Sequence, residues 1–183
     1  ALPIYAVAVY YVVATGEAAS NLSRYDGVHY GYRADGVADL ESLYRRSRGE
    51  GFGAEVKRRI MLGTYVLSEG YYSDYYKKAM QVRTLICRDF TRCFQQCDLL
   101  LGPTSPSVAF ARGAKTDDPL EMYLSDMFTI AANLSGNPAV SIPAGHDPDG
   151  LPIGLHLQAP AFADLALLDA AAALSRSEER RVE

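Results

Sequence analysis

The chain has 183 residues, of which 49% are hydrophobic and 22% charged, so it is long enough to bury the core of one globular domain. Its net charge of −4 argues against a surface that binds nucleic acid mainly by neutralising phosphates. No apolar run approaches the roughly 18 residues that a membrane-spanning helix needs, and no targeting peptide is recognisable, so we expect no membrane association.

The first predicted element is a strand over residues 5–14. This run is rich in Val, Tyr and Ala and has almost no polar residues, which is typical of a strand buried on both faces of a sheet. A long loop is predicted from Gly16 to Gly36, because the segment opens on small polar residues and contains several glycines. Loops of this length in a compact domain are often functional.

Three helices are predicted next. A short helix spans Asp39 to Arg48 and ends at Gly49, and a second helix runs from Ala54 to Leu67. A third helix, with Ser73 or Asp74 as its N-cap, shows one apolar face at spacings of three and four residues. The members of this face are Tyr75, Ala79, Val82, Ile86, Phe90, Cys93 and Cys97.

A short buried strand is predicted over residues 98–102, stopped by the proline that follows it. The sequence Asp117-Asp118-Pro119 then predicts a helix start, because acidic caps precede a proline at the first helical position. This helix is expected to continue to about Leu134 and to end at Gly136.

The C-terminal part predicts a hairpin and a helix. Residues 139–144 form the first strand, residues 147–150 give the turn, and alternating apolar residues after the turn form the second strand. A terminal helix is predicted from Asp164 to Leu174. Together these elements predict an α/β domain in which a mixed β-sheet is flanked by helices.

The cysteines and histidines give no sign of a metal site. Cys87, Cys93 and Cys97 lie within one helical pattern, without a CxxC pair or a nearby histidine, so we expect buried, reduced thiols and a cytoplasmic protein. The three histidines are far apart in the sequence. No metal ligands are therefore assigned.

Two charged residues stand out on the predicted helices. Asp126 has mainly apolar neighbours three and four residues away, and the only acidic neighbour of Arg59 at that range is Glu55. One interpretation is a structural ion pair or two solvated helix faces. The other is a pair that binds a zwitterion, in which Arg59 takes a carboxylate and Asp126 accepts from an ammonium group. The residues alone leave both open.

An ordered series of motifs resembles the C-terminal portion of the amidase-signature enzymes, and within them the A subunits of tRNA-dependent amidotransferases. The motifs are VYYVVA (9–14), SNLSRYDGV (20–28), YGYR (30–33), EVKRRIMLGTY (55–65), KTDDPL (115–120), MYLSD (122–126), NLSGNPAVSIPAG (133–145) and GLPIG (150–154). They span nearly the whole chain in the family's order.

The resemblance implies a parent subunit that hydrolyses glutamine with a Ser–cis-Ser–Lys triad and passes ammonia to a partner subunit. The implied partners are the B and C subunits. The B subunit would bind the misacylated tRNA, carrying Glu or Asp, and would use ATP and Mg²⁺ to activate it. No cofactor is assigned to this chain itself. No segment matches the family's catalytic serines or lysine, so no catalytic residue is assigned and the chain is expected to be inactive alone.

The resemblance also assigns substrate-binding residues. Arg59 matches the arginine that binds the α-carboxylate of glutamine, Asp126 the acid that binds its α-amino group, and Tyr10 a tyrosine of the same pocket. Other polar residues keep two interpretations, as lining of a ligand site or as local loop and turn chemistry. These are Asn21, Ser23, Arg24, Asp26, Thr104 and Ser105.

Residues 1–4 and 176–183 resemble translated adapter DNA, so residues 5–175 are taken as the amidase-like portion and the two ends as non-native. Two rival functions remain open. One is an amidase of the same fold that acts on other small amides. The other is a non-catalytic interaction domain that binds a partner through the loop at residues 16–36 and a tyrosine-rich surface.

Overall fold

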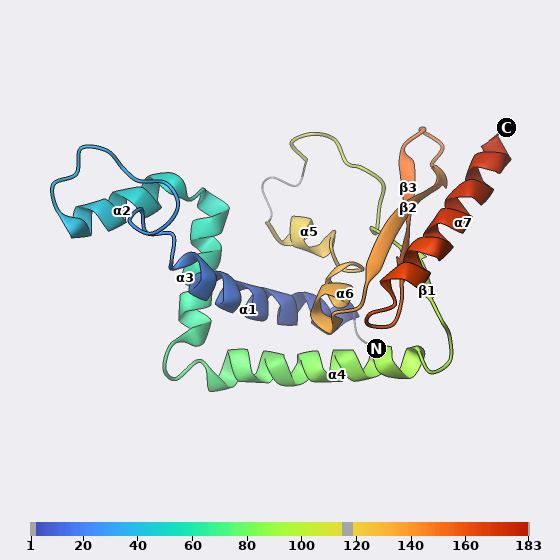
Figure 1. Ribbon diagram of the computed structural model, residues 1–183, viewed down its shortest axis with the longest axis horizontal. Coiled ribbons are helices and arrows are strands. Elements are labelled where there is room, and N and C mark those ends of the chain that lie inside the picture. Colours follow the sequence, from blue (N-terminus) through green and yellow to red (C-terminus); the bar gives the residue numbers. More distant parts are fainter. Residues whose placement is uncertain (1–2, 115–118, 183) are drawn as a thin grey trace. The chain divides into compact units, whose positions relative to one another are not determined.

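The computed structural model describes residues 3–114 and 119–182 and divides the chain into two compact units (Figure 1). The helical unit is Tyr10–Met80. The sheet unit is Ala1–Val9 with Gln81–Glu183. Helices α1 (Pro3–Leu22) and α4 (Lys78–Cys93) contribute residues to both units.

The first element is helix α1, so the predicted strand over residues 5–14 and the predicted loop start at Gly16 are both wrong. The run is apolar at nearly every position, and such a pattern does not separate a buried strand from a buried helix. Helix α1 extends well beyond this run and has 20 residues, which exceeds the usual length of a strand. Four of its five buried positions recur every three or four residues, as on one helix face: Ala6, Val9, Val13 and Gly16. The fifth is Thr15.

The loop that remains, residues 23–39, is tied to helix α2 (Leu40–Gly51). Asp39 is the N-cap of α2, and its Oδ1 accepts from the Ser42 N–H at 2.8 Å. The Ala34 N–H donates to Oγ of the buried Ser47 at 3.1 Å. The predicted helix is therefore confirmed, although it ends later than expected, and it anchors the loop.

Helix α3 (Ala54–Leu67) has the predicted bounds. It crosses α1 at Gly63, where a Cβ atom would meet the carbonyl oxygen of Thr15 and would lie 2.7 Å from Cβ of Ala19. Only a residue without a side chain permits this approach. The helix contact is closed to solvent, because Thr15 and Val66 have only 1% and 2% of their surface exposed.

Helix α4 follows a single π-helical turn, η1 (Ser73–Lys77). The predicted caps are wrong, because Ser73 and Asp74 lie inside this turn and Tyr72 precedes it without a side-chain cap bond. The centre of the predicted apolar face is confirmed by Ala79 and Ile86, which are buried.

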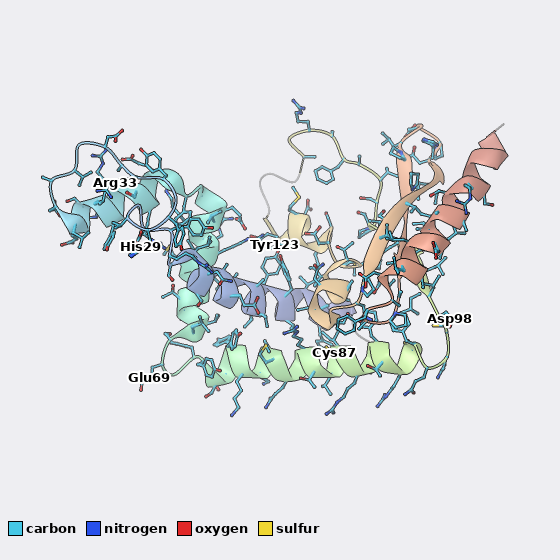
Figure 2. The ribbon with its side chains drawn as sticks, in the orientation of Figure 1. His29, Arg33, Glu69, Cys87, Asp98 and Tyr123 are labelled. Carbon is cyan, nitrogen blue, oxygen red and sulfur yellow. The ribbon has the colours of Figure 1, made fainter. Side chains whose placement is uncertain are left out.

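The cysteines are free thiols, but the burial predicted for them is wrong. Cys93 is exposed, and Cys87 and Cys97 are partly buried. Helix α4 ends at Cys93, so the apolar face does not continue to Cys97. Cys87 lies on α4 (Figure 2), where its Sγ is 3.8 Å from the carbonyl oxygen of Leu134.

Three strands form an antiparallel sheet in the order β1-β3-β2: β1 (Leu100–Pro103), β2 (Ala139–His146) and β3 (Pro152–Gln158). The predicted hairpin is confirmed as β2 and β3. In its turn, Oδ1 of Asp147 accepts from the N–H groups of Asp149 and Leu151, and Gly150 adopts a φ of +81°. The predicted α/β arrangement of a sheet with helices is confirmed, whereas the pairing among the three described strands is antiparallel and not mixed as predicted.

Helix α7 (Asp164–Val182) packs on one face of this sheet (Figure 1) and begins at the predicted residue. The contact buries five apolar residues: Ile142, Leu157, Ala159, Leu167 and Ala171. Strand β1 is less covered than predicted, because Leu101 is 58% exposed. The opposite face of the sheet carries Ser141 and His156, with Thr104 beside them directly after β1.

The single helix predicted up to Leu134 is two short helices, α5 (Pro119–Leu124) and α6 (Ile130–Ser135), so that prediction is wrong. Its predicted start at Asp117 and Asp118 lies outside the described residues. The break is explained by polar side chains that compete for backbone groups: Ser125 Oγ donates to the Glu121 carbonyl at 3.2 Å, and Thr129 Oγ1 to the Asp126 carbonyl at 3.1 Å.

Helix α6 ends as predicted at Gly136, which has a φ of +76° and donates its N–H to the Ala132 carbonyl at 2.9 Å. The Nε of Arg83 donates to the Leu134 carbonyl at 2.7 Å and satisfies another carbonyl of this helix end. Among the helices of the described residues, none is long and apolar enough to cross a membrane.

Candidate functional site

Arg59 lies on α3, where residues of α3 and α1 hold its guanidinium from two sides. Its Nε donates to Oε1 of Glu55, one helical turn earlier, at 3.0 Å. Its Cζ lies 5.7 Å from the ring centroid of Tyr11 on α1, within the range of a cation–π contact. The side chain is 34% exposed, so it is partly covered but open to a ligand.

Tyr10 belongs to the same group. Its ring packs edge-to-face on Tyr11, with centroids 5.2 Å apart. The hydrogen bond from Arg59 to Glu55 raises the pKa of Arg59 above its usual value, and Tyr10 contributes in the same direction against the opposing effect of burial. Arg59 is therefore a fixed cation beside two aromatic rings, and a carboxylate is the ligand that its planar fork prefers.

Asp126 lies in the turn between α5 and α6, in the sheet unit. Its carbonyl accepts from the N–H groups of Thr129 and Ile130, both at 3.1 Å, so the predicted neighbours three and four residues ahead are retained. The residue is exposed rather than covered by apolar neighbours. Arg59 and Asp126 belong to different units, so their convergence on one ligand stays a prediction.

A cavity of about 640 Å³ lies in the sheet unit, between α6, the sheet face opposite α7 and the segment before α7. Its polar lining comes from Thr104, Thr129, Asn133, Asn137, Ser141, His156 and Asp164. Thr129 lies three residues after Asp126, so the segment that carries Asp126 borders this cavity.

Polar groups on the cavity floor are held by one another. Thr104 Oγ1 and Ser141 Oγ form a hydrogen bond of 2.7 Å, and His156 is paired with Ser141 across β3 and β2. Burial lowers the pKa of His156, which favours its neutral form. Oε1 of Gln158 is buried and has no hydrogen-bond partner among the described residues. The Nε2 atom of the same amide lies 3.3 Å from Nδ1 of His156.

The hydrogen bond between the Thr104 and Ser141 hydroxyls has room only because residue 154 is a glycine. An added Cβ at Gly154 would lie 2.7 Å from Thr104 Oγ1 and 3.0 Å from Ser141 Oγ. We expect Gly154→Ala to lower the free energy of unfolding by about 1–3 kcal/mol through overpacking. Gly102→Ala on β1 is the matched control, because a Cβ there meets nothing within 4 Å. Urea unfolding of both variants measures the difference, and equal stabilities would contradict the steric reason.

The polar loop residues have local roles, as one interpretation of the sequence predicted. Ser23 Oγ donates to the Ser20 carbonyl, and Arg24 Nε to the Asn21 carbonyl. Oδ1 of Asp26 accepts from the N–H groups of Val28 and His29. The second oxygen of Asp26 lies 2.8 Å from Nδ1 of His29, which Figure 2 shows on this loop, and these bonds lower the Asp26 pKa.

A tyrosine cluster lies on the surface of the helical unit where α3 meets η1. The ring of Tyr65 lies 4.3 Å from that of Tyr71 and 6.1 Å from that of Tyr75, centroid to centroid. All three residues are between 42% and 44% exposed. A hydrogen bond with Tyr71 raises the pKa of Tyr65 to about 12. The helical unit therefore exposes several tyrosines, as the rival interaction function requires.

Several features of the site were not assigned from the sequence. Ser141 lies within the motif at residues 133–145 and His156 lies outside the motifs, but neither was given a role, because strand pairing is what brings them together. Glu55 was visible as a neighbour of Arg59, and its spacing of four residues could have identified the ion pair. Within the described ranges, no group of three or more metal-ligating side chains occurs.

Comparison with known proteins places these residues in a larger context. The A subunit of glutamyl-tRNA(Gln) amidotransferase from Thiobacillus denitrificans is 57% identical over 166 residues, which are 91% of this chain and 34% of the relative. The corresponding protein of Thioalkalivibrio sulfidiphilus is 61% identical over 165 residues, or 90% and 34% of the two chains. The chain thus spans about a third of the length of these curated relatives.

Solved structures show a similarity to the same kind of protein. The crystal structure of the A subunit of glutamyl-tRNA(Gln) amidotransferase from Thermotoga maritima matches with a TM-score of 0.61 and 41% identity, over 90% of this chain and 30% of that one. An amidase structure at 19% identity shares the fold, with a TM-score of 0.65 over 94% of this chain and 34% of the other. The predicted amidase-signature fold is confirmed. The model of the Amidase family matches residues 2–168, and the chain belongs to this family.

Proposed function

We propose that this chain is the C-terminal, substrate-holding portion of the A subunit of a tRNA-dependent amidotransferase. The complete subunit hydrolyses glutamine to ammonia, which a partner uses to amidate Glu-tRNA(Gln) or Asp-tRNA(Asn). The relatives with more than half of their matched residues identical carry the name of such a subunit. The triad of that reaction is assigned to the part of the parent protein that this chain does not match.

The observation that carries the proposal is the held guanidinium of Arg59. Glu55 accepts from its Nε, the Tyr11 ring lies beside it, and the Tyr10 side chain also interacts with it, so the Nη edge is the side that a second carboxylate would approach together with Tyr10. Free glutamine offers such a carboxylate on its backbone. In the proposed site Arg59 binds this α-carboxylate, Asp126 accepts from the α-ammonium group, and Tyr10 lines the pocket.

Fixing both backbone groups of glutamine has a mechanistic purpose. It leaves the side-chain amide as the only free end of the substrate and directs it to the upstream nucleophile. Orientation of this kind lowers the activation free energy of a reaction by roughly several kcal/mol. Arg59 and Asp126 are substrate-binding residues in this scheme, and no proton transfer is assigned to them.

The sheet unit supports assembly with further protein. The polar side chains of the cavity, among them Thr104, Ser141 and His156, are suited to contact with another polar segment, and we assign this segment to the catalytic region of the parent protein. The B and C subunits, tRNA, ATP and Mg²⁺, and a cytoplasmic location complete the proposed setting, with nucleotide chemistry assigned to the B subunit.

This function can be tested with a chimera. In it, the present chain replaces the matched third of the Thiobacillus denitrificans protein, within the complex that this protein forms with its partners. We expect the chimera to release ammonia from L-glutamine in preference to simple amides such as acetamide. Efficient hydrolysis of simple amides without glutamine hydrolysis would favour the rival amidase. Partner binding by a folded chimera with no glutamine affinity would favour the interaction domain.

A further inference from the structure

The carboxylate of Glu55 bridges two consecutive arginines on α3. Oε1 accepts from Nε of Arg59 at 3.0 Å, and Oε2 accepts from Nη1 of Arg58 at 2.5 Å. The three side chains thus form a short line of alternating charge, Arg58–Glu55–Arg59, in the first turns of the helix. Both oxygens of Glu55 are engaged by neighbours on its own helix.

We propose that Glu55, itself held by Arg58, is a positioning residue that sets the orientation of the Arg59 guanidinium for the substrate carboxylate. This inference rests on the proposed function of Arg59. A guanidinium on a long side chain has many rotamers, and binding in one geometry costs conformational entropy. A bond at Nε fixes the guanidinium plane and turns the Nη edge toward the ligand before the ligand arrives.

Arg58 adds an electrostatic contribution. Glu55 and Arg59 alone form a neutral pair, and a neutral pair attracts an incoming carboxylate weakly. With Arg58 on the second oxygen, the three side chains carry a net charge of +1, because two cations face one anion. The group therefore keeps a positive charge for an anionic ligand while Arg59 remains oriented.

Stability alone does not account for this arrangement. The side chains of Glu55 and Arg58 are 42% and 57% exposed, and ion pairs at such exposure contribute little to folding. Glu55 also lies in the first turn of α3, where a carboxylate interacts favourably with the helix dipole. That structural role predicts a small effect on melting temperature and no effect that depends on the ligand's carboxylate.

The test measures the KM for L-glutamine and for its α-amide, L-glutaminamide, in the complete subunit within its complex. We expect Glu55→Ala to raise the KM for glutamine about tenfold with kcat nearly unchanged, because the bond to the carboxylate is made equally in ground and transition states. Glu55→Gln keeps an acceptor for Nε and should raise this KM only about threefold. Arg58→Ala should raise it by a similar small factor that disappears at high salt.

L-glutaminamide distinguishes a positioning role of Glu55 from a general structural effect of its substitution, because this compound lacks the carboxylate that Arg59 binds. We expect its KM to be the same in the parent enzyme and in Glu55→Ala. The pair Arg46–Glu50 on α2 provides the control, since it has the same Nε to Oε1 contact at 2.9 Å and similar exposure. Glu50→Gln should leave the KM for glutamine unchanged.

Each outcome bears on a different claim. A raised KM for Arg59→Ala with no change for Glu55→Ala would overturn the positioning role and leave the proposed function standing. An equal rise for glutamine and L-glutaminamide in folded Glu55→Ala would also overturn it, since the effect would then be structural. An unchanged KM for Arg59→Ala would overturn the proposed function itself.

Discussion

Arg59→Ala in the complete subunit is expected to raise the KM for glutamine by about 100-fold, which corresponds to about 2.7 kcal/mol of lost binding energy. The variant removes a charge-assisted, two-donor contact with the α-carboxylate and leaves that carboxylate without a partner in a partly covered site. Folding should be maintained, because the side chain is one-third exposed and its ion pair is local to α3. Steady-state ammonia release at several glutamine concentrations measures the effect.

Two variants serve as controls for this result. Arg59→Lys keeps the charge but loses the planar fork and the Nε bond to Glu55, so it should recover only part of the affinity. Arg46→Ala removes an exposed arginine of the same helical unit from a comparable ion pair and should have little effect. If Arg46→Ala and Arg59→Ala had equal KM values, a binding role specific to Arg59 would be excluded.

Gly63→Ala is expected to lower the free energy of unfolding by about 3 kcal/mol, although alanine is the better helix former by about 1 kcal/mol. The added methyl group would meet the backbone carbonyl of Thr15, which cannot move aside as a flexible side chain can. Helices α1 and α3 would have to separate. Tyr11 and Arg59 each lie one turn before this crossing, so the KM for glutamine should rise as well.

Gly49→Ala is the matched control for this variant. Gly49 lies inside α2 and a Cβ there meets nothing within 4 Å, so the substitution should stabilise the protein by about 0.5–1 kcal/mol. Both variants replace a helical glycine by alanine, but the expected changes in the free energy of unfolding have opposite signs. Thermal or urea unfolding distinguishes them, and a stabilising Gly63→Ala would contradict the close crossing of α1 and α3.

The elements that could be predicted from sequence are those with a clear period or clear end signals. Helix α3 has an amphipathic stripe, the β2–β3 hairpin has an Asp-Pro-Asp-Gly turn, and α7 begins at an acidic residue. Helix α1 could not be predicted in this way. Its run is apolar on nearly all sides, and only its contacts select the helix, so neither period stands out.

The break between α5 and α6 has a different cause. The end predicted for this helix at Gly136 is confirmed, but Ser125 and Thr129 donate to backbone carbonyls locally, and the N–H groups of residues 125–127 bond to carbonyls three rather than four residues back. Burial was also harder to predict than helicity. Cys93 continues the apolar stripe of α4 and is nonetheless exposed at the end of that helix.

For the site, the sequence identified Arg59 as unusual and the family resemblance supplied its role. The structure adds the contacts with Glu55 and Tyr11, which depend on helical spacing and on the crossing with α1. The cavity residues Ser141 and His156 required strand register, since they are fifteen positions apart in the chain and opposite each other in the sheet. The turn at residues 147–150 predicts the hairpin but not this pairing, because a bulge between Pro143 and His146 shifts the register.

We propose that Arg59 and Asp126 bind the two backbone groups of one glutamine molecule. A crystal structure of the complete subunit with bound glutamine tests it most directly. We expect the α-carboxylate within about 3 Å of the Nη atoms of Arg59 and the α-ammonium group within about 3 Å of the Asp126 carboxylate. Glutamine bound with its carboxylate on other residues, and with Arg59 in contact only with Glu55 and solvent, would contradict the claim.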